Sequence, residues 1–415
     1  MDPIALSIPA FFFLMGVEWF VSWWRGVPVY RFGDWVANLG CGIVQQTSKI
    51  ALALVTGILY VYLFQNHRLY ELDAGSGWVW LACFIGVDFF YYWFHRFSHE
   101  LNFMWAAHVV HHQSEEYNLG VALRQSAFQG GFSWFFYLPL AFVGFPPVVT
   151  GTIRALNALY QFWIHTKLIG RLGPLEWVLN TPSHHRVHHG QNPQYIDRNH
   201  AGTLIIWDKM FGTFEPEGEE VVYGVTEPPN SWNPIFANFH HWALTWRRME
   251  AASNWRDKLR VWVDRPGYVP PGMVDTAKRE DPMSKYETTV VKPLLIYVSV
   301  QFAFLTAATT AYLFYRRLVE PAPLMAWGIA IILTAGSLGA LLDHRKWVRP
   351  LETFRPAVVS AVFALLLPEQ LLSAGPLALL AALSVLSGWG LHRALAVQDA
   401  HAASETAYGG EVGEL

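Results

Sequence analysis

The sequence predicts an all-α membrane protein, a polytopic helical bundle with a histidine-rich two-metal site at its cytoplasmic face. Three observations predict this class. The 415-residue chain is 53% hydrophobic and only 15% charged. It contains several apolar runs close to the roughly 20 residues that cross a bilayer as a helix. Its histidines gather in motifs with helical spacing. The net charge of −3 argues against nucleic-acid binding, which leaves a basic footprint.

The apolar runs predict the membrane topology. Two arms, about 132–145 and 147–164, are separated by the turn signal Pro146-Pro147 and are expected to form a helical hairpin. The first long run lacks a basic region before it and is expected to be a retained helix rather than a signal peptide. The runs expected to span the membrane are roughly 4–24, 41–64, 78–94, 293–314, 324–342, 356–373 and 375–394.

Residues 1–290 are expected to form a membrane domain with its core motifs at 80–245. Residues 291–396 are expected to add C-terminal transmembrane helices, and residues 397–415 a disordered tail. Arg25 and Arg31 follow the first run, so the positive-inside rule places the first loop in the cytoplasm. Counting spans from there puts every dense histidine cluster on the cytoplasmic face of a bacterial inner membrane or an endoplasmic reticulum membrane.

Three histidine motifs follow one another along the chain. Residues three or four apart share a helix face, so each motif is expected to present its imidazoles from one side of a helical turn. His165, at the end of the hairpin, adds a ninth nitrogen donor on the same membrane face. The motifs are His95-x3-His99, His108-x2-His111-His112 and His185-x2-His188-His189.

Nine convergent imidazoles exceed what one metal ion can use. A catalytic zinc keeps three protein ligands and a structural zinc four, so the number of donors favours a two-metal centre. Imidazole binds Fe, Cu and Zn alike, and a site that needs open positions for dioxygen favours iron. Surface histidines at a membrane interface are the simpler explanation for a single HxxxH, but not for three ordered clusters on one predicted face.

Two carboxylates are predicted to act beside the histidines. Asp88 lies seven residues before His95 and eleven before His99, so the three share a helix face. A carboxylate at membrane depth is costly, and orienting a ligand histidine is a common task for one. Pairing with a neighbouring helix is the structural alternative. Glu100 follows His99 directly and could be a ligand, an orienting group, a proton carrier or a solvated interfacial residue.

Other polar residues near the motifs receive weaker assignments. Asn157 and Gln161 form a polar stripe with His165, in which Gln161 could support a ligand, face the substrate or bond between helices. His184 is expected to support the third motif without binding metal. Structural or substrate-channel roles are expected for His200, His240 and His241.

The ordered motifs resemble the fatty acid hydroxylase/sterol desaturase superfamily, whose mark is HxxxH, HxxHH, HxxHH. Over about residues 80–245 the chain resembles the alkylglycerol monooxygenase branch of that superfamily. The segments that carry this similarity include "FHRFSHELNFMWAAHVVHHQ", "SHHRVHHGQNPQYIDRNHAG" and "VVYGVTEPPN".

The resemblance implies a membrane di-iron monooxygenase. It implies that O2 and tetrahydrobiopterin are used to hydroxylate the ether-linked carbon of an alkylglycerol lipid, which then falls apart into a fatty aldehyde and glycerol. The eight motif histidines would bind two Fe ions, and Glu100 would be a further essential acid. The pterin-binding residues are left open, with Arg124, Gln125 and Tyr117 as candidates.

Other functions stay open at this stage. Related enzymes hydroxylate or desaturate sterols and fatty acyl chains with other electron donors, so the donor discriminates between the two lipid-oxygenase hypotheses. A histidine-rich membrane metal transporter belongs to another class. Against it, transporter ligands sit near the midplane on broken helices, whereas these motifs lie at predicted helix ends. A zinc hydrolase is disfavoured by the number of ligands. The sequence does not determine the oligomeric state.

Overall fold

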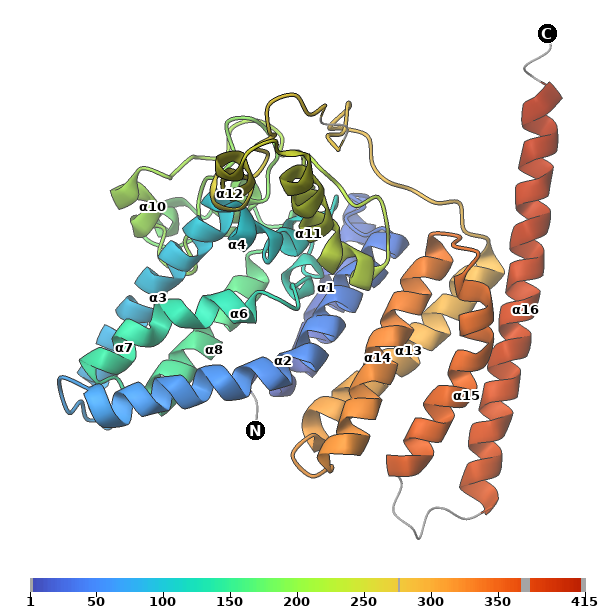
Figure 1. Ribbon diagram of the computed structural model, residues 1–415, viewed down its shortest axis with the longest axis horizontal. Coiled ribbons are helices and arrows are strands. Elements are labelled where there is room, and N and C mark those ends of the chain that lie inside the picture. The colour runs from blue at the N-terminus through green and yellow to red at the C-terminus, as the bar shows by residue number, and fades with distance from the viewer. Residues whose placement is uncertain (1–2, 275–276, 367–373, 412–415) are drawn as a thin grey trace. The chain divides into compact units, whose positions relative to one another are not determined.

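The computed structural model describes residues 3–274, 277–366 and 374–411, and within these ranges every extended regular element is a helix (Figure 1). The only β contacts among them are two isolated bridges. The predicted all-α class is therefore confirmed. The chain divides into two compact units, one of residues 1–230 and 236–286 and the other of residues 231–235 and 287–415.

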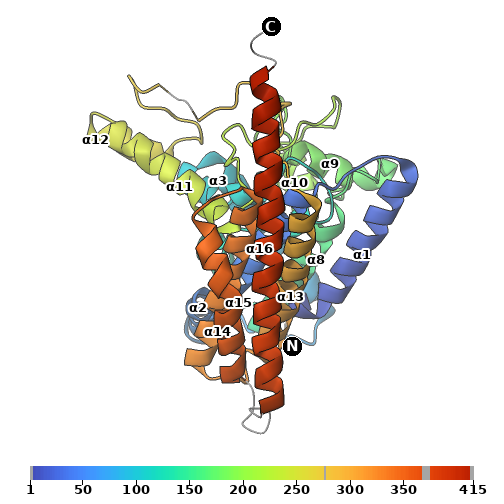
Figure 2. The same ribbon diagram turned by 90° about the vertical axis from the view of Figure 1, so that its right-hand side faces the viewer.

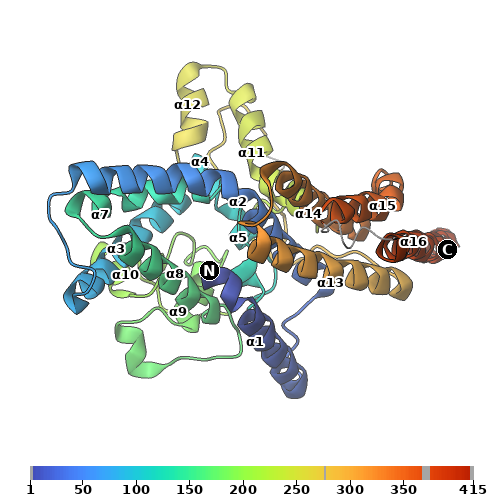
Figure 3. The ribbon, with the colours of Figure 1, turned by 90° about the horizontal axis from the view of Figure 1, so that it is seen from below.

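Four long helices form the body of the first unit: α1 (Pro3–Arg25), α2 (Phe32–His67), α3 (Gly77–Glu100) and α8 (Pro147–Trp163). Helix α3 packs against α8, and α1 also contacts α8. Helix α2 lies beside the short helix α7 (Leu138–Val143), as Figure 3 shows. The ends of α3 and α8 bring the first histidine motif and His165 to the same region.

The predicted hairpin forms, but its first arm is not one helix. It consists of α6 (Gly130–Ser133), the 3₁₀ turn η2 (Trp134–Tyr137) and α7. The arms join at Gly144, which has φ +111°, a conformation that favours glycine. A Cβ there would lie 2.0 Å from the carbonyl oxygen of Tyr70. Helix α8 then begins with Pro147, which suits the first helical position because its missing N–H would be unpaired there.

Short helices and ordered loops cover the ends of α3 and α8. Asn102 ties this cap together because its side-chain amide donates to Thr245 Oγ1 at 3.3 Å and to the Val261 carbonyl oxygen at 2.7 Å. These contacts join helices α4, α11 and α12, which lie close to one another in Figure 1. The cap helices are α4 (Asn102–Ala106), α5 (Val109–His112), η1 (Val121–Leu123), η3 (Gly173–Trp177), α9 (Pro182–His188), α10 (Ile206–Phe211), α11 (Pro234–Ala251) and α12 (Trp255–Val263).

The second unit is a bundle of four helices: α13 (Lys292–Tyr315), α14 (Pro321–Leu342), α15 (Val348–Leu366) and α16 (Ala374–Glu411). Each packs against the next in the chain, and α16 returns to α13. Figure 2 shows their roughly parallel axes. Helix α16 extends to Glu411, where a disordered tail from 397 was expected. Four alanines among residues 397–411 favour helix there.

Among the residues whose side chains the structure describes, five helices are long and apolar enough to cross a membrane: Leu6–Arg25, Gly77–Glu100, Lys292–Tyr315, Pro321–Leu342 and Leu377–Ala403. They coincide with five of the predicted runs, and the protein is a multi-pass membrane protein. The predicted run 41–64 lies within α2, and part of it lies outside the residues whose side chains the structure describes. Part of the run 356–373 lies outside the described residues.

Candidate metal centre

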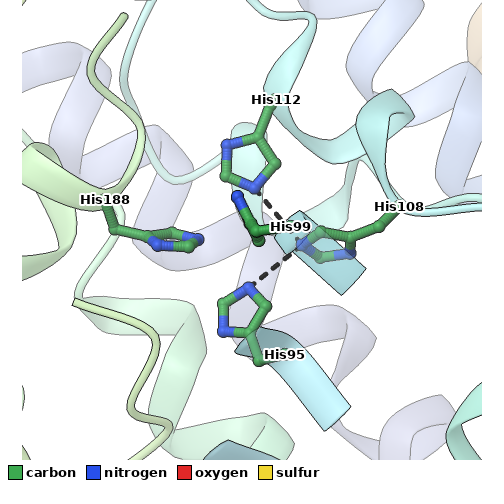
Figure 4. Close-up of side chains that lie close together, drawn as sticks. All are labelled: His95, His99, His108, His112 and His188. Atoms are coloured by element: carbon green, nitrogen blue, oxygen red, sulfur yellow. Dashed lines mark hydrogen bonds between the residues drawn. The ribbon is translucent and has the colours of Figure 1, made fainter. Parts of the chain in front are cut away.

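The nine predicted nitrogen donors are all buried and lie in two groups. Within each group the nitrogens that could bind metal lie within 4.8 Å of one another. Figure 4 shows the rings of the larger group facing a common centre. We call the sets the five-histidine group, which is His95, His99, His108, His112 and His188, and the four-histidine group, which is His111, His165, His185 and His189.

The two HxxHH motifs are each divided between the groups, so the expectation that each motif faces one point is corrected. His111 joins the four-histidine group while His112 joins the five-histidine group. In the third motif, His188 and His189 separate in the same way. Adjacent residues on a helix point about 100° apart. The paired histidines at the end of each of these two motifs therefore point into different groups.

Backbone carbonyls orient four of the rings. A carbonyl oxygen can only accept a hydrogen bond, so each of these rings carries its proton on Nδ1 and keeps a lone pair on Nε2. This arrangement is typical of metal-binding histidines. The Nδ1–H donors and their acceptors are His95 to the His200 oxygen at 2.7 Å, His111 to Arg124 at 2.9 Å, His165 to Gln161 at 2.6 Å and His188 to Arg198 at 2.9 Å.

Lone pairs face each other in both groups. His108 is oriented through its Nδ1 by the side-chain oxygen of Gln129 at 3.2 Å, which leaves its Nε2 3.0 Å from His95 Nε2 (Figure 4). In the other group, the Nε2 atoms of His111 and His165 are 3.3 Å apart.

A second proton on one ring of a pair would remove the repulsion between the lone pairs, but these rings do not bind one at neutral pH. Burial lowers the pKa of His111 to about 4 and holds the pKa values of His108 and His165 well below their usual range. Two lone pairs at these distances repel unless a cation lies between them. The Nε2 atoms of His99, His188 and His189 are also buried without a hydrogen-bond partner among the described residues. Both groups therefore fit a metal ion.

The loop after the third motif places two of the accepting carbonyls. Asp197 and Asn199 have positive φ values of 57° and 54°, which Asp and Asn tolerate better than most residues. The fully buried Asp208 accepts the backbone N–H groups of His200 and Ala201, both at 2.8 Å. The turn is thus held so that its carbonyls face the five-histidine group.

Asp88 holds an adjacent segment, which corrects the expectation that it orients a histidine directly. Among the described residues, its carboxylate accepts four hydrogen bonds, and no histidine is a donor. The donors are Asn157 Nδ2 at 2.7 Å, the Thr203 N–H at 2.8 Å, the Leu204 N–H at 2.9 Å and Trp207 Nε1 at 3.0 Å. The structural alternative for Asp88 was a contact with a neighbouring helix. The hydrogen bond from Asn157 is such a contact, because Asn157 lies on α8.

Glu100 lies beside the five-histidine group and outside it. Its carboxylate is 3.1 Å from Arg96 Nε and 4.0 Å from Arg265 Nη2. Arg265 also lies 3.7 Å from Asp197, whose carboxylate is 3.8 Å from His99 Nδ1. Glu100 therefore belongs to a charged rim next to the histidines.

Gln161 on α8 bonds between helices, one of the three roles left open for it. It accepts from the Tyr91 hydroxyl at 2.6 Å and donates to Asn157 Oδ1 at 2.7 Å. Its backbone carbonyl orients His165. The expected polar stripe of α8 is therefore a chain of contacts that ends at the four-histidine group.

Two residues considered for pterin binding are engaged elsewhere. Arg124 is buried and donates to the Val110 carbonyl, Asn38 and Gln113. Tyr117 is buried, donates to the Ile164 carbonyl and stacks on Tyr223 with ring centroids 4.9 Å apart. Both side chains hold segments that carry histidines, through the carbonyls of Val110 and Ile164, and neither has a free face for a pterin.

His200 is closer to the metal groups than the sequence indicated. Its ring centroid lies 5.1 Å from that of His99 and 5.8 Å from that of His188. Both ring nitrogens are buried without a hydrogen bond among the described residues. Because His200 belongs to none of the HxxH patterns, spacing gave no signal for it. His241, by contrast, is structural, since its Nε2 bonds Asn102 Oδ1 at 2.8 Å.

Comparisons with known proteins agree with this geometry. Residues 80–213 match the fatty acid hydroxylase family. The chain is 45% identical over 360 residues to an alkylglycerol monooxygenase of Xenopus tropicalis, covering 85% of this chain and 80% of that protein. It is 42% identical over 363 residues to the Homo sapiens enzyme of the same name, covering 85% and 81%, and 32% identical over 371 residues to that of Caenorhabditis elegans, covering 82% and 72%. No solved structure was found to match.

Proposed function

The chain belongs to the alkylglycerol monooxygenase family, and from that premise we propose that it cleaves alkylglycerol ethers with O2 and tetrahydrobiopterin. It is a lipid monooxygenase of the fatty acid hydroxylase type. The observation that carries the proposal is that Nε2 lone pairs face each other within each histidine group. Bound there, two iron ions would activate O2 for insertion into a C–H bond.

The histidines would hold the metal through Nε2. The carbonyls of residues 124, 161, 198 and 200 fix ring orientation by accepting Nδ1–H. These contacts preorganise the donors, because the rings need not turn when metal binds. Asp88 and Asp208 hold the segment that carries two of these carbonyls.

The lipid substrate is proposed to bind in a cavity of the first unit that adjoins the five-histidine group. A cavity of about 420 Å³ is lined by residues of α2, α6 and α8. One of its lining residues is Gln129, which also orients His108. Trp134 and Leu138 supply apolar wall in the same cavity. An alkyl chain held there would place a carbon near its polar end beside the histidines and away from bulk water.

The products follow from the position of the new hydroxyl group. Replacing C–H by C–OH on the ether-linked carbon makes a hemiacetal, whose C–O bond breaks to leave a fatty aldehyde and glycerol. The second oxygen atom leaves as water, with electrons from the reduced pterin. Glu100, paired with Arg96 at the end of α3, is proposed to support this region as an acidic residue outside both histidine groups.

We also propose that the histidine groups face the cytoplasm. Arg25 ends α1 and Arg31 precedes α2, and such positive charges favour the cytoplasmic side. Cysteine-accessibility labelling in sealed vesicles tests this orientation. A cysteine introduced at the exposed Leu69, in the loop between α2 and α3, should react from the side opposite to one introduced at Arg25.

The decisive experiment measures fatty aldehyde release from 1-O-hexadecylglycerol by the purified, iron-loaded protein, with and without tetrahydrobiopterin. Aldehyde that appears only with the pterin supports the whole proposal. Aldehyde formed equally well with a ferredoxin and no pterin would reject the donor. A protein that holds two irons per chain but releases no aldehyde would reject the substrate and leave the metal assignment standing.

A further inference from the structure

The C-terminal bundle contains a cavity that the proposed reaction does not use. Its volume is about 480 Å³, within the range of small-molecule binding sites. Residues of all four helices, α13 to α16, line it. Most of the wall is apolar, with Phe304, Ile331 and Leu383 among its residues, but Gln301 and Arg355 give one part a polar surface.

A closed ion pair lies behind the polar part. Glu352 is fully buried and Arg355 is 8% exposed. Arg355 donates from Nε to Glu352 Oε2 at 2.8 Å and from Nη2 to Oε1 at 2.5 Å. The Tyr297 hydroxyl donates to Oε1 at 2.7 Å, and the Ser337 hydroxyl donates to Oε2. Each carboxylate oxygen thus accepts two hydrogen bonds, and the two charges cancel.

Uncharged polar side chains extend from this ion pair along the cavity wall. Gln301 accepts from Arg355 Nη2 at 2.6 Å and donates from Nε2 to the Ser387 hydroxyl at 2.9 Å. The hydroxyls of Ser360 and Ser384 lie 2.8 Å apart on the same wall. A hydroxyl can donate one hydrogen bond and accept two, so this wall can bind another hydroxyl in either direction.

We propose that the cavity binds a single-chain lipid with an uncharged, hydroxyl-bearing headgroup. The chain would lie along Phe304 and Leu383, with its hydroxyls on Gln301, Ser384 and Ser387. An anionic headgroup is disfavoured because Glu352 already neutralises Arg355. A cationic headgroup is disfavoured because both oxygens of Glu352 are occupied and buried.

The ligand class follows from the cavity alone. A 1-alkylglycerol has the required chemistry, and its choice as probe rests on the proposed function, of which it is the substrate. The site would then hold substrate on residues other than those of the histidine groups. Buried charges among membrane helices mark functional sites by default, which agrees with a binding role for this bundle.

Photolabelling of the full-length protein tests the proposal. The His188→Ala variant, placed in phosphatidylcholine nanodiscs, receives a 1-O-alkylglycerol with a diazirine in its chain, and labelled peptides are mapped by mass spectrometry. We expect labels on α13, α15 and α16 that an excess of 1-O-hexadecylglycerol suppresses. Equal concentrations of lysophosphatidic acid and lysophosphatidylcholine should leave the labels in place.

Two variants locate the site. Ala308→Trp fills the cavity and should reduce the suppressible labelling about tenfold, whereas Ala303→Trp, on the exposed face of the same helix, should leave it unchanged. Gln301→Leu removes hydrogen bonds to the headgroup and should weaken competition by about threefold to tenfold. An unchanged midpoint of thermal unfolding in detergent shows that each variant is folded.

Suppression of the labels by all three competitors alike, or by none of them, would overturn the proposal. Either result would mean that bilayer lipid fills the cavity without selection of a headgroup. Unchanged labelling in Ala308→Trp would overturn it as well. Since His188→Ala is not required to react, this binding result does not depend on whether the wild-type protein releases aldehyde. The two proposals can therefore fail separately.

Discussion

The two units bury polar side chains in opposite ways. In the first unit, backbone carbonyls take the Nδ1 protons of four histidines and leave Nε2 lone pairs directed at one another. In the second unit, Glu352 and Arg355 satisfy each other, and Tyr297 and Ser337 complete the carboxylate. The first arrangement is complete only with added cations, while the second is complete without any.

This difference separates two reasons for burying polarity. Lone pairs that face each other repel unless a positive ion lies between them, so binding of the proposed metal would be coupled to folding there. A neutral ion pair stores no such requirement, and its visible consequence is a polar patch on an otherwise apolar cavity. Each of the following substitutions removes one of the side chains on which this difference between the units depends.

The largest expected effect comes from removing one histidine from each group. His188→Ala and His111→Ala should each lower the iron content from about two ions to about one per chain. Aldehyde release should fall by more than about 100-fold, since even supporting residues of metal sites are worth 10- to 100-fold. Iron analysis by mass spectrometry, together with the aldehyde assay, checks both. His67→Ala, an exposed histidine outside both groups, is the control. Full activity in either variant would refute its assignment as a ligand.

Breaking the ion pair should lower the stability of the second unit and leave the iron content of the protein unchanged. Glu352→Gln leaves the Arg355 charge buried and unpaired, which costs about 3–5 kcal/mol. The double variant Glu352→Met, Arg355→Met should recover most of that loss. Thermal unfolding in detergent measures stability, and iron content should stay at the wild-type level in both. A double variant as unstable as the single one would show that the pair itself carries net stability.

Asp88→Asn should weaken both the fold and the metal site. The amide would turn its NH2 group toward the donors of residues 203, 204 or 207, and an unsatisfied buried group costs about 1–3 kcal/mol. Because the same segment includes the carbonyl that orients His95, iron affinity should drop by about 10- to 100-fold. Iron titration of the metal-free protein measures the change, and Glu71→Gln, at an 86% exposed side chain, serves as the control. Unchanged affinity would separate Asp88 from the metal site.

The smallest effect is expected for Gln129→Leu. His108 would lose a neutral acceptor at 3.2 Å, and the affinity of the five-histidine group should fall by about threefold to tenfold. The four-histidine group should keep its affinity. Ser133→Ala, which changes the same cavity wall, is the matched control. A larger loss from the four-histidine group would contradict the assignment of Gln129 to the other group.

Much of the candidate centre follows from residue identity and spacing. Eight nitrogen donors in three motifs with helical spacing, together with His165, predict a two-metal site. Apolar runs near 20 residues predict the membrane helices, because both signals depend on local periodicity. The broken first arm of the hairpin was not predicted, because its backbone path depends on the close approach of Gly144 to the Tyr70 carbonyl. The expected tail from 397 is helical as far as Glu411, because its alanines favour helix over the disorder that Gly409-Gly410 and the acidic residues indicate.

The sequence by itself determined which side chains can bind metal, because imidazole chemistry is a property of the residue. Only the tertiary structure decided how His111 and His112, or His188 and His189, divide between two centres. It also decided that the carbonyls of residues 124, 161, 198 and 200 orient the rings, and that Asp88 holds a loop rather than a histidine. Every residue type except proline carries the same backbone N–H and carbonyl groups, so their partners are set by the path of the chain and leave no mark in the residue pattern.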